Sequence, residues 1–215
     1  MVKIVLDAGH GQGTLGKQSP DGEREWGFNS QVVEAREAKL KAYENVEVLR
    51  VDDSTGKTDI PLVERTNKAN KWQADVYVAV HHNANTGSWG NWTGVETFTF
   101  NGQSVSTKST ELAKLVQPRI AKAMGLTDRG VRQANFHVLR ETKMPAILTE
   151  GGFMDSFIDI QALRSTDKLR AQGEAIAEAL AVYYKLKKKS VETDAYDKDP
   201  FRLPDLQRNF NRRSI

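Results

Sequence analysis

The 215-residue sequence contains no cysteine, which excludes disulfide bonds and thiolate metal sites. Any metal site must therefore be built from histidine, aspartate and glutamate side chains. The sequence also lacks an apolar run long enough to cross a membrane, and no basic segment and apolar core precede the first predicted strand. We therefore expect neither membrane insertion nor a signal peptide, and synthesis in the cytoplasm.

The basic character of the chain is confined to its last part. Residues 1–184 hold 22 Lys and Arg against 23 Asp and Glu, a net charge of −1, whereas residues 185–215 hold 9 against 5, a net charge of +4. A basic tail favours an anionic surface such as nucleic acid or a wall polymer. A solubilising linker explains the same composition, so both interpretations of residues 185–215 stay open.

Predicted strands alternate with predicted helices along the chain, which indicates an α/β fold. Short apolar runs predict strands at residues 2–6, 47–51, 75–80, 94–100, 136–139 and 145–148. Apolar residues at helical spacing predict helices at residues 28–43, 62–72, 109–124 and 167–184. We expect a single domain over residues 1–184, with a twisted, mostly parallel central sheet flanked by helices, and a basic linker or C-terminal tail over 185–215.

Three chemically capable side chains follow predicted strands. His10 comes after the first strand, His81 after the strand at 75–80, and Glu150 after the strand at 145–148. The carboxyl ends of parallel strands share one edge of a sheet, where ligands bind. Two imidazoles and a carboxylate converging there indicate catalytic zinc, which takes three protein ligands and leaves a position for water. The plain alternatives are a turn histidine at 10 and a buried ion pair at 150.

A competing motif overlaps the first of these positions. Residues 11–17 read Gly-x-x-x-x-Gly-Lys directly after a strand, as in a phosphate-binding P-loop. Gln18 replaces the required Ser or Thr, the following Ser-Pro-Asp-Gly cannot begin the required helix, and no apolar strand ends in a Walker-B aspartate. We therefore reject a nucleotide-binding function.

Four ordered blocks give the chain a family resemblance. They are residues 6–11 (Leu-Asp-Ala-Gly-His-Gly), 25–29 (Glu-Trp-Gly-Phe-Asn), 80–84 (Val-His-His-Asn-Ala) and 145–153 (Pro-Ala-Ile-Leu-Thr-Glu-Gly-Gly-Phe). Together, over about residues 2–184, the sequence resembles the zinc-dependent N-acetylmuramoyl-L-alanine amidases of bacterial autolysins and phage endolysins. This resemblance implies hydrolysis of the amide between N-acetylmuramic acid and L-alanine in peptidoglycan, which lyses the cell wall.

The resemblance also assigns roles to single residues. It implies that His10, Glu25 and His81 bind Zn²⁺ and that Glu150 is the catalytic acid–base; without it, Glu25 would be read as a solvated loop carboxylate. His82 is then a neighbour of a ligand on the opposite face of its strand. His137 is interpreted as a structural or groove histidine, Arg65 as a packing or loop-anchoring residue, and Trp89 and Trp92 as weak candidates for lining a groove.

The implied partner is peptidoglycan, and we expect a monomer that binds no nucleic acid. Action on the wall after release, as in a phage endolysin or a mother-cell lytic enzyme, fits the expected lack of a signal peptide. Two other functions stay open: a non-catalytic wall-binding module with the same fold, and a zinc peptidase that cleaves another amide, such as a carboxypeptidase.

Overall fold

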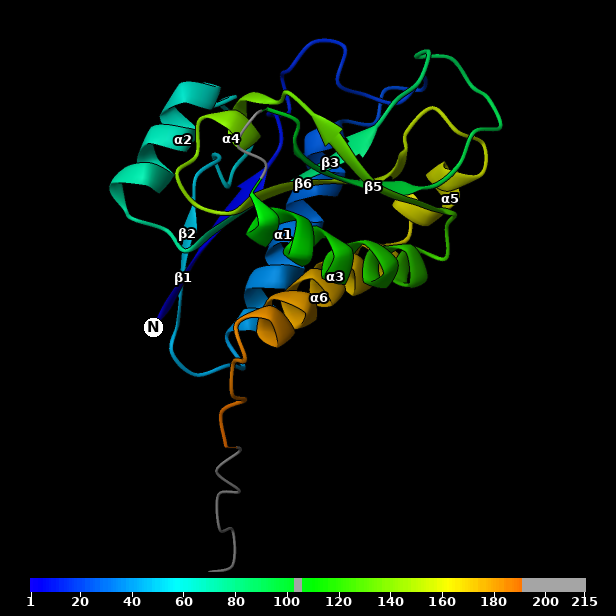
Figure 1. Ribbon diagram of the computed structural model, residues 1–215. Helices are drawn as coiled ribbons and strands as arrows, with labels where there is room; N and C mark the ends of the chain where they lie inside the picture. The colour runs from blue at the N-terminus through cyan, green and yellow to red at the C-terminus, as the bar shows by residue number, and fades with distance from the viewer. Residues whose placement is uncertain (103–105, 191–215) are drawn as a thin grey trace, which may run out of the picture.

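The computed structural model of the protein describes residues 1–102 and 106–190. Within them, six strands form one sheet in the order β2-β1-β3-β6-β4-β5 (Figure 1). All neighbouring strands are parallel except β4 and β6, which are antiparallel. In chain order the elements are β1 (Val2–Ala8), α1 (Glu25–Leu40), β2 (Val46–Arg50), α2 (Leu62–Lys71), β3 (Val76–Asn83), β4 (Val95–Phe100), α3 (Thr107–Met124), β5 (Asp128–Ala134), α4 (His137–Arg140), β6 (Ala146–Phe153), α5 (Asp159–Leu163) and α6 (Thr166–Tyr183).

Helices cover both faces of the sheet, so that it has two hydrophobic cores. Helices α1, α3 and α6 pack on one face and α2 and α4 on the other (Figure 1). Strand β1 supplies both cores by alternation: Ile4 and Leu6 belong to the larger cluster and Val5 to the smaller. Burial on both faces explains why the central strands are nearly continuous apolar runs. The predicted α/β domain with a mostly parallel sheet is thereby confirmed.

Helices α1 and α6 approach each other closely because of one glycine. A Cβ atom added to Gly173 of α6 would lie 2.3 Å from the backbone oxygen of Val32 and 2.8 Å from the Cβ atom of Ala35, both on α1. A larger residue would therefore push the two helices apart. This packing fixes α1, whose first residue is Glu25, against the body of the protein.

Two predictions of secondary structure near the β4 side of the sheet were wrong. The segment 136–139, predicted as a strand, overlaps the short helix α4, which begins at His137. Strand β5 was not predicted, because its residues are polar and mostly exposed and so carry no apolar pattern. The first strand also extends two residues further than predicted, and strands β3 and β6 continue through His81 and Glu150 to Asn83 and Phe153.

The first residues of the predicted tail pair with the body. The backbone nitrogen of Lys189 donates to the oxygen of Ala42 at 2.9 Å, and that of Glu44 donates to the oxygen of Lys187 at 2.9 Å. Residues 191–215 lie outside the described residues, so the linker interpretation stays a prediction. Among the described residues, no helix is long and apolar enough to cross a membrane.

Candidate metal centre and active site

The sheet brings the predicted residues of strands β3 and β6 side by side. His81 on β3 is in register with Glu150 on β6, and both lie within their strands. Strand β1 neighbours β3 on the other side, where the backbone nitrogen of Gly9 donates to the oxygen of Val80 at 2.9 Å. His10 therefore enters the same edge of the sheet directly after β1.

Glu25 links the two histidines into one group. Its Oε1 atom lies 3.0 Å from Nδ1 of His81, and its Oε2 atom lies 3.3 Å from Nε2 of His10. One ligand atom from each of these three residues lies within 4.8 Å of the other two. The group holds two nitrogens and a carboxylate, a donor set that binds transition metals such as zinc.

Helix α1 places the Glu25 carboxylate with the help of the residue one turn further on. Glu25 is the first residue of α1, and its backbone nitrogen donates to the oxygen of Lys17 at 3.0 Å. The side-chain amide of Asn29 donates to Glu25 Oε1 at 3.3 Å and to the backbone oxygen of Gly9 at 3.0 Å. Asn29 therefore ties α1 to the loop that carries His10. The sequence analysis gave it no role, although its spacing of four residues from Glu25 on a helix predicts the contact.

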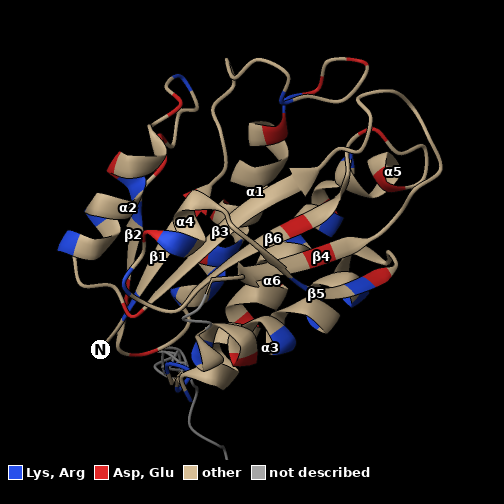
Figure 2. Cartoon of the chain, turned by 45° about the horizontal axis from the view of Figure 1, so that its top comes forward, with Lys and Arg blue, Asp and Glu red and all other residues tan. Residues whose placement is uncertain are grey.

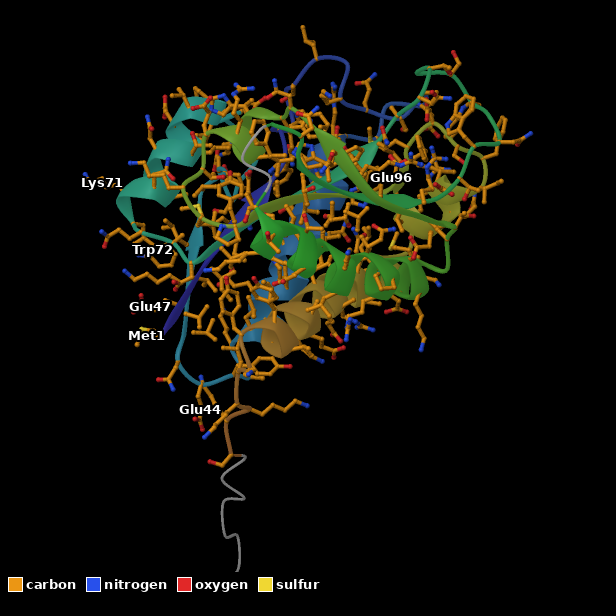
Figure 3. The ribbon with its side chains drawn as sticks, in the orientation of Figure 1. Met1, Glu44, Glu47, Lys71, Trp72 and Glu96 are labelled. Atoms are coloured by element: carbon orange, nitrogen blue, oxygen red, sulfur yellow. The ribbon has the colours of Figure 1, made fainter. Side chains whose placement is uncertain are left out.

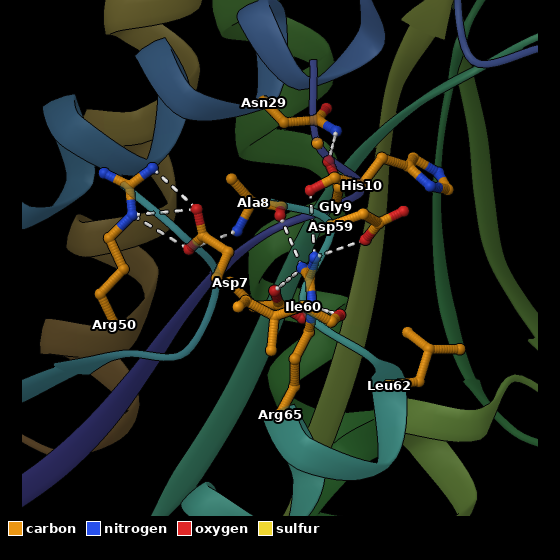
Figure 4. Close-up of polar contacts among 12 residues, drawn as sticks. Asp7, Ala8, Gly9, His10, Asn29, Arg50, Asp59, Ile60, Leu62 and Arg65 are labelled. Carbon is orange, nitrogen blue, oxygen red and sulfur yellow. Dashed lines mark hydrogen bonds and ion pairs between the residues drawn. The ribbon is translucent and has the colours of Figure 1, made fainter. Parts of the chain in front are cut away.

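Arg65 holds the backbone around His10. His10 has a φ of 66°, a left-handed conformation that is uncommon for residues other than glycine. Arg65 donates from Nη2 to the backbone oxygen of His10 at 3.0 Å and from Nη1 to that of Ala8 at 2.8 Å (Figure 4). The same guanidinium pairs with Asp7 at 2.6 Å. The interpretation of Arg65 as a loop-anchoring residue is confirmed.

A glycine beside His10 leaves room for the second imidazole. A Cβ atom on Gly9 would lie 2.1 Å from Cε1 of His81, and real contacts are never that short. Any side chain at position 9 would therefore displace the His81 ring. This explains physically why a glycine precedes His10.

The charge states of His10 and Glu25 suit metal binding, whereas burial lowers the pKa of His81 but Glu25 and Glu150 raise it above its usual value, so a metal competes with a proton there. Burial lowers the pKa of His10 from 6.5 to about 4, so its ring is neutral near pH 7. Burial raises the pKa of Glu25, but the hydrogen bond and charge of His81 and the charge of His10 outweigh this and lower it to about 2. Neutral imidazole and ionised carboxylate are the forms that coordinate a metal.

Glu150 differs from Glu25 because one of its oxygens has no partner. Its Oε2 atom is buried and, among the described residues, forms no hydrogen bond. Burial raises the pKa of Glu150 from 4.5 to about 8, and the negative charge of Glu25 acts in the same direction against the opposing effect of His81. Glu150 lines a small cavity together with Glu25, His81 and Lys17. It is a carboxyl group that can exchange a proton near neutral pH.

Comparisons with known proteins agree with this geometry. Residues 4–182 match the family described as N-acetylmuramoyl-L-alanine amidase. The chain belongs to this family.

Individual relatives support the same membership. The chain is 39% identical over 191 residues to the N-acetylmuramoyl-L-alanine amidase CwlM of Bacillus licheniformis, covering 87% of this chain and 71% of that protein. It is 34% identical over 194 residues to the endolysin of Bacillus phage SPP1, covering 88% and 69% of the two chains. The crystal structure of an N-acetylmuramoyl-L-alanine amidase from Clostridium difficile 630 superposes with a TM-score of 0.78 at 33% identity, covering 86% of this chain and 97% of that one. The predicted family and amidase activity are thereby confirmed.

The other two histidines lie outside the group of three. The His82 ring points to the opposite face of β3, as predicted, where Nδ1 lies 2.8 Å from Oδ1 of Asn29 and Nε2 lies 3.4 Å from Oε1 of Gln172. His137 begins α4, and its Nε2 lies 3.3 Å from the hydroxyl of Thr66. The position of His82 agrees with the interpretation from the sequence, and the choice between a structural and a groove histidine at His137 stays open.

The loop between β3 and β4 is fixed by a buried carboxylate. Asp155 accepts hydrogen bonds from the backbone nitrogens of residues 85, 86 and 87 at 2.8 Å each, and from the indole of Trp92 at 2.8 Å. Trp92 is thereby an anchor of this loop. Trp89 instead stacks on Phe157, with ring centroids 5.3 Å apart.

The amidase has no P-loop at residues 11–17. A P-loop leads directly into a helix, whereas here the chain continues as turns and bends until α1 begins at Glu25. The Lys17 backbone is used to bind Glu25, as described above. The segment therefore lacks the strand–loop–helix arrangement of a P-loop.

Proposed function

We propose that this chain is a zinc-dependent peptidoglycan hydrolase that cleaves the amide between N-acetylmuramic acid and L-alanine. In this proposal His10, Glu25 and His81 hold the zinc ion and Glu150 transfers protons. The observation that carries it is the convergence of these three ligand atoms within 4.8 Å, beside a carboxylate in register with His81. Family membership supports the reaction, and the geometry supports the choice of these four residues.

The spacing of the three donors fits a zinc ion. Ligand atoms bonded to zinc at about 2.0–2.2 Å in a tetrahedron lie roughly 3.3 Å from one another. The Oε1 atom of Glu25 lies 3.0 Å from His81 and its Oε2 atom lies 3.3 Å from His10, and one ligand atom from each residue lies within 4.8 Å of the others, so small side-chain shifts would reach this spacing. Asn29 and Arg65 orient the donors from outside, as residues around a metal site commonly do.

The proposed reaction divides between the metal and the carboxyl group. Bound zinc supplies Lewis acidity, which polarises the amide carbonyl and makes a water nucleophilic near neutral pH. Glu150 in its ionised form accepts a proton from the attacking water through its unpartnered Oε2 atom. It then donates a proton to the nitrogen of L-alanine as the C–N bond breaks, which returns Glu150 to its ionised form.

We extend the proposal to the bounds of the catalytic domain, its binding partner and its oligomeric state. The catalytic unit is predicted over residues 1–184 and contains all four proposed site residues. Its partner is the peptidoglycan of the cell wall, with no nucleic acid, and the working form is a monomer. The four Lys residues between 185 and 189 carry the basic charge toward the end of the described chain, where it favours an anionic wall polymer.

The test is product analysis of digested peptidoglycan by mass spectrometry, with and without metal. We expect new free amino groups on L-alanine and no new reducing sugar ends. A chelator should abolish the release of these products, and added zinc should restore it, because the proposed reaction requires the zinc ion that His10, Glu25 and His81 hold. New amino termini at another stem residue would assign a peptidase instead, and full activity after verified metal removal would contradict the zinc mechanism.

A further inference from the structure

A second charged cluster lies one strand away from Glu150. Glu96 on β4 is in register with Glu150 on the antiparallel neighbour β6, so the two Cα atoms are about 5 Å apart. Figure 3 labels Glu96 on this side of the sheet, and Figure 2 shows acidic and basic segments gathered where β4, β5 and β6 lie side by side. The proposed mechanism uses none of this cluster.

Two arginines of β5 share the single carboxylate of Glu96. Its Oε1 atom lies 2.8 Å from Nε of Arg129 and 3.2 Å from Nε of Arg132. Asn83 donates to the other oxygen at 3.5 Å, and the Glu96 side chain is only 8% exposed. In the part of the chain that the structure describes, neither arginine has a second acidic partner. The three side chains therefore carry a net charge of +1.

A β-bulge brings the two arginines to the same side. Residues three apart on a regular strand point to opposite faces of the sheet. Here the register shifts: Val95 pairs with Asp128 and Thr97 with Val131, so β5 has one more residue than β4. Gly130, with a φ of 84°, lies in this extra segment. The bulge therefore re-aims the β5 side chains so that both can contact Glu96.

The guanidinium groups are partly open to solvent. The Arg129 side chain is 35% exposed and the Arg132 side chain 51%, whereas the carboxylate that orients them is buried. Arginine N–H groups match a carboxylate in a planar, bidentate geometry. A buried acid that fixes two basic groups, with one positive charge left over, is suited to bind one more anion.

We propose that Arg129 and Arg132 bind a carboxylate of the stem peptide, namely that of an acidic second residue. This inference rests on the proposed function, which places the scissile amide beside Glu150. An extended peptide spans roughly 3.3–3.6 Å per residue, so the second stem residue lies about 7 Å from the scissile carbonyl. This distance is about one strand spacing, from Glu150 to Glu96, plus the length of the contact from Glu96 to the arginines. The arginines are positioning residues for the substrate rather than catalytic ones.

The test compares two soluble muropeptides that differ only in the second stem residue, D-glutamate with a free carboxylate or D-isoglutamine with its amide. Wild type should prefer the carboxylate in kcat/KM. Arg132→Gln should reduce that preference roughly two- to fivefold, the scale of one solvent-accessible charge pair. The loss should appear in KM rather than kcat, and Arg132→Lys should restore part of the preference because it keeps the charge.

The matched control is Arg170→Gln on α6, whose side chain is 62% exposed and, among the residues that the structure describes, pairs only with Asp167. It removes the same charge away from β5 and should keep the wild-type preference. Equal effects of Arg132→Gln on both substrates, or an unchanged preference in both Arg132→Gln and Arg129→Gln, would overturn the subsite while leaving the proposed function intact. Release of no product from either substrate by wild type would overturn both.

Discussion

The two buried charge clusters on either side of the His10 backbone differ in how completely they are hydrogen-bonded. Arg65 uses all five of its N–H groups: on Asp7, on Asp59 and on the backbone oxygens of residues 8, 10 and 60. Asp7 in turn accepts from the hydroxyl of Tyr77 at 2.6 Å. The group of His10, Glu25, His81 and Glu150 instead leaves Glu150 Oε2 without a partner.

We infer that this difference separates the structural charges around Arg65 from the proposed catalytic carboxyl group of Glu150. A fully paired buried charge holds a single geometry, and removing one member strands the others. A buried oxygen without a partner costs stability in the free protein and is retained where a ligand, a water or a proton uses it. We infer that the Arg65 cluster maintains the backbone that carries His10 of the proposed metal site.

The largest expected effect comes from breaking the paired cluster. Arg65→Met should lower the free energy of unfolding by about 3–5 kcal/mol, because it leaves the Asp7 carboxylate buried without its cation. Denaturant titration of the metal-free protein measures this change. Arg170→Met, which removes an exposed arginine, should change the same quantity by no more than about 0.5 kcal/mol. A similar loss of unfolding free energy in the two variants would contradict the structural role of the Arg65 cluster.

The next effect concerns activity rather than folding. Glu150→Gln should lower kcat by roughly a hundredfold or more, because it removes the acid–base group. The metal content of the purified variant, measured by atomic emission, should stay at the wild-type level, since Glu150 is not among the proposed ligands. Loss of metal from the variant would show that the roles of Glu25 and Glu150 have been confused.

The smallest effect is a pH dependence of stability. Because the pKa of Glu150 is raised to about 8 in the folded protein, the folded state keeps a proton that the unfolded state releases above about pH 4.5. The contribution of Glu150 to the free energy of unfolding is therefore favourable at low pH and is lost as the pH rises through 8. In metal-free protein, Glu150→Gln should gain stability relative to wild type by about 1–3 kcal/mol between pH 5 and 8.

His10 and His82 do not obscure this comparison, whereas His81 is coupled to Glu150, because burial lowers its pKa but the charges of Glu25 and Glu150 raise it. Burial lowers the pKa values of His10 and His82 to about 4, so their contributions rise with pH between about 4 and 6.5 in both proteins. The informative quantity is therefore the difference between the two unfolding free energies, followed by denaturant titration at several pH values. Parallel curves for wild type and variant would mean that Glu150 titrates normally.

The central strands of the sheet were predicted better from the sequence than the outer strand β5. Strands β1, β3 and β6 are buried on both faces and therefore appear as apolar runs, which places His10, His81 and Glu150 at the carboxyl ends of neighbouring strands. Glu25 lies in a polar region with no periodic pattern, so only the family resemblance assigned it. Where Glu25 lies relative to the histidines depends on the packing of α1 against the sheet, which no local pattern encodes.

The β5 side shows why the rest could not be predicted. Edge strands face solvent and need no apolar alternation, so Asp128–Ala134 resembles a loop. The contact of Arg129 and Arg132 with Glu96 depends on strand register and on a bulge, both of which are set by tertiary pairing. The four residues of α4 contain Val and Leu, which favour a strand when read alone, and the segment is too short for a helical period to be recognised.

The pairing of Lys187 and Lys189 with the loop after α1 holds the end of the described chain on the side of the molecule opposite the proposed active site. Met1 precedes β1, and the described chain ends at Ser190 beside residues 42–44, so both ends lie at the amino ends of the strands (Figure 1). The proposed metal site lies at the carboxyl ends. A fusion partner or a solid support attached at Met1 would thus sit behind the enzyme, and the proposed catalytic end would stay free to face an extended, flat polymer.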